Sequence, residues 1–249
     1  MLKTSYILLF ITLWIIILFV YNSALIKTNV QVKERRKKLL IPSLVIALWL
    51  VIQYLVSVSG FYHNLNLPPR IPIFMILPLF LFIVLFLSKN KESNIIDAIP
   101  IYIPIAYQSF RSVIEVLFYF TFIQGILPIQ VTFEGANYDV LLGVSAIFMG
   151  IYAFKKNISK KLLIGWNIIG IGIVLFAAFT FVTSFYFPSI WGQENSVISQ
   201  EFNQFPFLLL PLFFMPSAIF MHILSIIQLK RKLKSENTVA NNGNRCTSL

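Results

Sequence analysis

Seven long apolar segments, separated by polar or basic connections, make up most of this chain. An α-helix needs about 20 apolar residues to span a hydrocarbon layer of roughly 30 Å. Helices also satisfy their own backbone hydrogen bonds, as lipid requires, and the alternating pattern of a membrane strand is absent. The sequence therefore predicts an all-α, polytopic transmembrane bundle of about seven helices. The predicted helices lie near 5–26, 39–60, 71–88, 100–126, 138–154, 162–186 and 205–229.

The composition supports a single membrane domain. Charged residues make up 12% of the 249 residues and hydrophobic residues 58%, whereas a soluble domain carries roughly a quarter charged residues. We assign residues 1–234 to the seven-helix transmembrane domain. The polar segment 235–249 has no apolar periodicity and is expected to be a disordered cytoplasmic tail.

Lysine and arginine are divided unequally between the two sets of connections. Seventeen of the 20 basic residues fall in one set, whereas Lys3 and Arg70 fall in the other and Arg111 lies inside a predicted helix. The basic set consists of the segments 27–38, 89–99, 155–161 and 230–249. Basic residues accumulate on the cytoplasmic side of a membrane. The pattern predicts a multi-pass protein of the inner (cytoplasmic) cell membrane, with its N-terminus outside and its C-terminus in the cytoplasm. Since the net charge of +11 follows this topology, it indicates no nucleic-acid partner.

The predicted helix 100–126 carries charged residues near its midpoint. Arg111 and Glu115 are four residues apart and therefore share one helical face, where they are expected to pair. Gln108 and Tyr119 extend the same polar stripe. A charge at this depth costs at least about 2.5–3.5 kcal/mol, so the stripe must face protein or water rather than lipid.

Other polar residues occur at a matching depth in the last two predicted helices. His222 and Ser225 lie in the inner half of the seventh, and Asn167 lies in the inner half of the sixth. These residues are expected to line one cavity, open toward the cytoplasm, together with the stripe. The candidate ligand-binding residues are Gln108, Arg111, Glu115, Asn167 and His222. A structural alternative is that Arg111 and Glu115 only neutralise each other, with His222 as a hydrogen-bonding core residue.

Small residues predict a second feature of the bundle. Gly143 and Gly150 lie in the fifth predicted helix, and Gly165, Gly170 and Gly172 lie in the sixth. Small residues allow membrane helices to approach closely. These two helices are therefore expected to form a close antiparallel hairpin.

The outer connections carry four carboxylates and few basic residues. These carboxylates are Glu134, Asp139, Glu194 and Glu201. They are consistent with a cation-attracting surface, but solvated loop charges are the favoured interpretation.

The sequence lacks the residues that several known kinds of cofactor or metal site in membrane proteins require. No lysine for a retinal Schiff base occurs in the last predicted helix before Lys230, and the two histidines, His63 and His222, fall at opposite depths for a haem. The single cysteine, Cys246, excludes cysteine-based metal sites, and no HExxH motif occurs. We therefore expect neither a cofactor nor a metal.

One set of residues resembles a known group. Arg111-Ser-Val-Ile-Glu115, the segment from Leu127 to Asp139, Trp166-Asn167 and a late His222 together are similar to a group of uncharacterised bacterial seven-helix integral membrane proteins. The similarity covers roughly residues 100–228. It implies a bacterial cytoplasmic membrane and brings no activity with it.

Three functions fit these features. The favoured one is a transporter or binding protein for a small molecule or lipid, in which Arg111 holds an anionic group and Glu115 balances the charge. The second is a non-catalytic accessory or sensory subunit whose basic segments contact membrane lipids or a partner. The third, less favoured, is a membrane enzyme acting on a lipid, with Glu115 or His222 as general base. The oligomeric state stays open.

Overall fold

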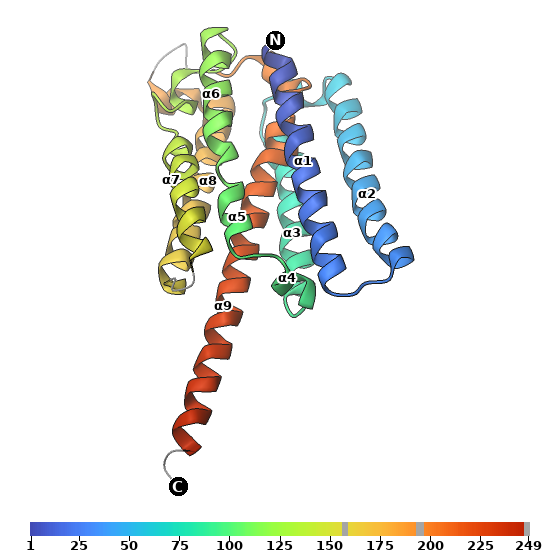
Figure 1. The fold of residues 1–249 in the computed structure, drawn as a ribbon. Coiled ribbons are helices and arrows are strands. Elements are labelled where there is room, and N and C mark those ends of the chain that lie inside the picture. Colours follow the sequence, from blue (N-terminus) through green and yellow to red (C-terminus); the bar gives the residue numbers. More distant parts are fainter. Residues whose placement is uncertain (156–158, 193–196, 247–249) are drawn as a thin grey trace.

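The described part of the chain, residues 1–155, 159–192 and 197–246 of a computed structural model, consists of helices and the loops between them, without a strand (Figure 1). Two π-helical segments, η2 (Pro72–Ile76) and η7 (Leu210–Phe214), directly precede α3 and α9. The α-helices are α1 Leu2–Lys27, α2 Val32–Val58, α3 Leu77–Asn90, α4 Asn94–Ala98, α5 Tyr102–Tyr107, α6 Phe110–Ile123, α7 Asp139–Phe154, α8 Lys160–Tyr186 and α9 Met215–Cys246. The prediction of an all-helical chain is confirmed for these residues.

Five of the described helical segments are long and apolar enough to cross a membrane. They are Leu2–Lys27, Val32–Val58, Pro72–Asn90, Lys160–Tyr186 and Leu210–Glu236. The other two predicted segments are built differently, because α7 has only 16 residues and the segment near 100–126 is divided between α5 and α6. Figure 1 shows α5 and α6 following one another nearly end to end. These apolar helices are consistent with an integral membrane protein.

The division between α5 and α6 has a local cause. The backbone N–H groups of Gln108, Ser109, Arg111 and Ser112 each bond to the carbonyl three residues earlier, at 3.0–3.1 Å. Such tighter turns replace the regular α-helical ladder over a short stretch and change the direction of the following side chains. The polar stripe predicted for one continuous helix is therefore interrupted directly before Arg111.

The glycines predicted to join α7 to α8 serve other contacts. A Cβ atom on Gly143 would lie 2.5 Å from the backbone nitrogen of Ser112, and one on Gly150 would lie 3.0 Å from the Cβ of Ala106. Both glycines therefore bring α7 close to the α5–α6 segment rather than to α8. The prediction that these glycines join α7 to α8 was wrong, because residue spacing alone does not show which neighbouring helix a small residue faces.

Two of the connections predicted to lie outside are folded against the bundle. Ser57 Oγ donates to the carbonyl of Asn203 at 2.5 Å, and Asn203 Nδ2 donates to the carbonyl of Tyr62 at 3.3 Å. Phe202 and Phe207 are buried beneath this connection. The segment 197–209 thus covers the end of the bundle where the N-terminus lies (Figure 1).

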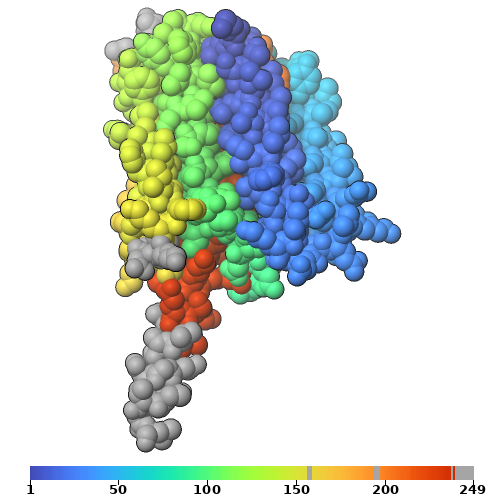
Figure 2. All heavy atoms as spheres, in the orientation of Figure 1, coloured from blue at the N-terminus to red at the C-terminus, as the bar shows by residue number. Residues whose placement is uncertain are grey.

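The opposite end of the molecule carries the extension of α9. Figure 1 shows this helix extending beyond the other helices, and in Figure 2 its red part emerges below them. Gln228 Nε2 donates to the carbonyls of Ile96 and Ile99, at 2.6 and 2.8 Å, and Arg231 pairs with Asp97 at 2.6 Å. The helix continues to Cys246, so the segment expected to be disordered is helical as far as that residue.

Candidate functional site

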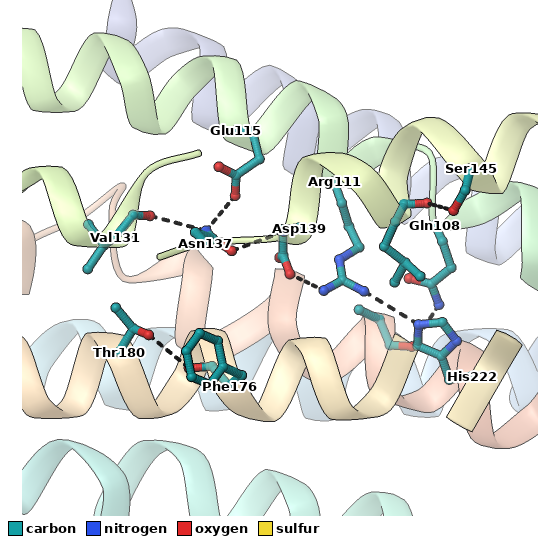
Figure 3. Close-up of polar contacts among 12 residues, drawn as sticks. Gln108, Arg111, Glu115, Val131, Asn137, Asp139, Ser145, Phe176, Thr180 and His222 are labelled. Carbon is teal, nitrogen blue, oxygen red and sulfur yellow. Dashed lines mark hydrogen bonds and ion pairs between the residues drawn. The ribbon is translucent and has the colours of Figure 1, made fainter. Parts of the chain in front are cut away.

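Arg111 lies at the centre of the buried polar residues. Its side chain is only 2% exposed, and its Nη2 forms an ion pair with Asp139, the first residue of α7 (Figure 3). Its Nη1 lies 3.5 Å from Nε2 of His222. The expected pairing with Glu115 is replaced by this contact across the bundle. Asp139, taken from the sequence as a solvated loop charge, is only 14% exposed and belongs to the site.

His222 on α9 connects Arg111 to α8. Its Nδ1 lies 2.9 Å from Oδ1 of Asn167. The amide nitrogen of Asn167 donates to the carbonyl of Leu163 at 2.7 Å and to Ser225 Oγ at 3.1 Å. Because these bonds leave the amide oxygen facing the imidazole, the ring proton is placed on Nδ1 of His222 and the lone pair on Nε2 faces Arg111.

The position of His222 depends on a close approach by α8. A Cβ atom at Gly170 would lie 2.3 Å from Cε1 of His222 and 2.6 Å from its Nε2. The ring of Trp166 lies beside the imidazole, with ring centroids 5.6 Å apart. Gly170 therefore gives the imidazole the room it needs between the two helices.

Glu115 occupies a separate position on the same helix as Arg111. Its Oε1 accepts a hydrogen bond of 2.6 Å from Nδ2 of Asn137, which also donates to the carbonyl of Val131 (Figure 3). Oδ1 of Asn137 accepts from the backbone N–H of Asp139 at 3.1 Å. Asn137 thus joins Glu115 to the first turn of α7. Sequence reasoning missed Asn137, although an asparagine two residues before a helix start is a typical turn-forming residue.

Gln108 completes the set of predicted residues. Its Nε2 donates to the carbonyl of Ala218 on α9 at 2.9 Å. All five predicted residues are buried. The structure brings Arg111, Asn167 and His222 into one hydrogen-bonded chain, whereas Gln108 contacts α9 nearby and Glu115 bonds to Asn137 instead.

A cavity lies on one side of Arg111. About 850 Å³ between the lining side chains, counted to the open side of the cavity, is free of protein atoms. Arg111 and Asp139 are the charged residues in its wall. Among the five predicted site residues, only Arg111 lines it. The cavity extends from Arg111 toward Tyr186 and Asn203 at the end with the N-terminus, not toward the end predicted to be cytoplasmic.

The cavity is partly open along one side. Buried residues of α6 form its inner wall, whereas Ala178 and Val182 on α8 and Ile76 at the end of η2 are half-buried. α8 packs mainly against α9 and α7, and η2 packs against α3 and η7. The half-buried residues therefore lie where α8 and η2 face each other without extensive packing. Tyr186, the last residue of α8, accepts a 3.2 Å hydrogen bond from the backbone N–H of Ile71, directly before η2. This bond joins α8 to η2 at the end of the bundle where the N-terminus lies.

Some buried polar atoms of the site have no hydrogen-bond partner among the described residues. They are Nε of Arg111, Oε1 of Gln108 and Oε2 of Glu115. Within the same ranges, no three histidine, cysteine or acidic residues come together as metal ligands. Unpaired buried groups are costly, and each of these three atoms has less than 1 Å² of accessible surface, so a molecule in the cavity does not reach them.

No family model, curated protein or solved structure matches this chain. The resemblance to a group of bacterial membrane proteins therefore stays a prediction.

Proposed function

We propose that this chain crosses the cytoplasmic membrane seven times, with its N-terminus outside, and binds a small lipid-like molecule within the membrane. In this arrangement the α5–α6 segment forms the fourth crossing and α7 forms the fifth. The two ends of the described chain lie at opposite ends of the bundle (Figure 1), as an odd number of crossings requires. The basic connections support the same orientation, although Lys156 lies outside the described residues.

The natural Cys246 tests this topology, because the chain has no other cysteine. In a bacterial host, a membrane-impermeant maleimide should label Cys246 in inverted membrane vesicles but not in intact cells. A Cys246→Ser protein with Asn66→Cys, in the exposed connection after α2, should give the opposite pattern. Labelling of Cys246 from outside intact cells would refute the orientation.

The binding proposal depends on the character of the cavity. Its wall is almost entirely apolar, it is partly open at the side of the bundle, and a buried ion pair lies in its wall. Ligand sites typically combine apolar walls with a few placed polar groups. A side opening between apolar helices admits a molecule dissolved in the bilayer more readily than one dissolved in water.

Binding of this kind is common to a transporter and to a binding protein that does not transport. A catalytic role has less support, because neither Glu115 nor His222 lines the cavity. The proposed site therefore consists of Arg111, Asp139 and the apolar wall beside them. His222 and Asn167 hold Arg111 in place from the opposite side.

Native mass spectrometry of the purified full chain tests the binding proposal. Ala178→Leu adds a large side chain at the cavity wall, whereas Gly172→Leu adds the same side chain where a new Cβ meets nothing within 4 Å. Wild type and Gly172→Leu should retain the same bound lipid-like mass, and Ala178→Leu should lose it. Equal retention by all three folded proteins would refute binding in this cavity.

A further inference from the structure

The cavity follows the second half of α8. Its wall on α8 includes residues from Val174 to Tyr186, a separation of about 18 Å at 1.5 Å per helical residue. One extended hydrocarbon chain matches this length.

The wall becomes polar only near its two ends. Arg111 and Asp139 lie at the inner end, and Asn203 and Tyr186 lie at the other. Between them, the wall consists of aliphatic and aromatic side chains such as Ile114, Phe118 and Phe181. A ligand in this cavity can therefore place a polar group beside Arg111 and its hydrocarbon chain along α8.

The charge at the inner end selects the kind of polar group. Asp139 already neutralises Arg111, and Glu115 lies one helical turn away with no second cation paired to it among the described residues. A carboxylate or phosphate would bring a further negative charge into this apolar surrounding, and an ammonium group would bring a positive one. Both lose their hydration without a free partner, which is costly.

A hydroxyl group can bond to the ion pair without adding charge. Its O–H can donate to the carboxylate of Asp139, whose side chain is 14% exposed and lines the cavity. We propose that the cavity binds a neutral single-chain amphiphile with a terminal hydroxyl group, held by the carboxylate of Asp139 beside Arg111. This inference depends on the proposed function, because it names the class of molecule that the same cavity takes.

Equilibrium binding of three radiolabelled probes to the full chain in nanodiscs tests the class. The probes are 1-hexadecanol, hexadecanoate and hexadecyltrimethylammonium, which share one chain length and differ in charge. We expect 1-hexadecanol to bind at least about tenfold more tightly than either charged probe, because a charged group loses its hydration in this apolar cavity. Ala178→Leu should remove this binding, and Gly172→Leu should preserve it.

The other results separate failure of this inference from failure of the proposed function. If a charged probe bound more tightly, or if a two-chain phospholipid occupied the cavity, and Ala178→Leu removed it, the hydroxyl class would be wrong and binding in the cavity would stand. If none of these molecules bound in a manner sensitive to Ala178→Leu, and no mass were lost from that variant, both proposals would fail.

A second variant tests recognition of the polar end without leaving a buried charge. Arg111→Met combined with Asp139→Leu removes both members of the ion pair together, a change that folded proteins tolerate better than loss of one partner. Wild type should prefer 1-hexadecanol to hexadecane by about tenfold or more, and the double variant should bind the two equally. An unchanged preference would place the hydroxyl elsewhere and overturn the inference.

Discussion

α2 and α9 are both long apolar helices, yet they have very different surroundings. In the most apolar 18-residue window, 6% of the residues of α2 are buried inside the bundle, compared with 56% for the segment Leu210–Glu236, which contains η7 and the first part of α9. α2 lies at the edge of the bundle in Figure 1, and its polar contacts, such as Gln53 Nε2 to the carbonyl of Phe74 at 3.2 Å, lie near one end. α9 instead carries His222, Ser225 and Gln228, all buried and hydrogen-bonded to other elements.

This difference shows what composition conceals in a membrane protein. Lipid tails are as apolar as leucine, so an apolar helix gains little by exchanging lipid for protein. A helix with buried polar side chains must find partners, because lipid offers none. The polar residues of α9 therefore determine which helices it contacts, whereas the apolar surface of α2 sets no comparable requirement.

The largest expected effect is at the ion pair beside α9. Arg111→Leu leaves Asp139 without its partner in an apolar surrounding and should lower the free energy of unfolding by about 3–5 kcal/mol. Thermal unfolding of the purified variant in the wild-type detergent measures the loss. Arg111→Met with Asp139→Leu should recover most of it. If the double variant were as unstable as Arg111→Leu, the ion pair would not be the cause.

The character of the helices was predictable from the sequence, but their polar contacts were predictable only in part. Depth along each segment placed Arg111, Asn167 and His222 at one level, and the structure joins them. The pairing of Arg111 with Glu115 was wrong because the four-residue rule assumes a regular helix and no competitor. Asp139 competes through the fold of the connection 124–138, which local spacing does not describe.

The second expected effect compares leucines on the two helices directly. Leu224 on α9 is 4% exposed and Leu44 on α2 is 59% exposed. Leu224→Ala should cost about 2–5 kcal/mol by leaving a space in the packed interior. Leu44→Ala should cost less than about 0.5 kcal/mol, because lipid fills the space at a surface position. Thermal unfolding of both variants measures the difference, and equal losses would show that α2 is packed in the folded protein, for example against a second copy.

The smallest expected effect concerns two glycines on α8 that differ only in what they face. A Cβ at Gly170 would collide with His222, whereas one at Gly172 meets nothing within 4 Å. Gly170→Ala forces the imidazole away from Arg111 and should destabilise the protein by about 1–3 kcal/mol, as overpacking typically does. Gly172→Ala should be neutral or stabilising, because alanine favours a helix over glycine by about 1 kcal/mol. Both variants make the same chemical change two residues apart, so thermal unfolding of the pair isolates the contact with α9. Equal behaviour would mean that His222 has room to move, and that its contact with Arg111 does not depend on the close approach of α8.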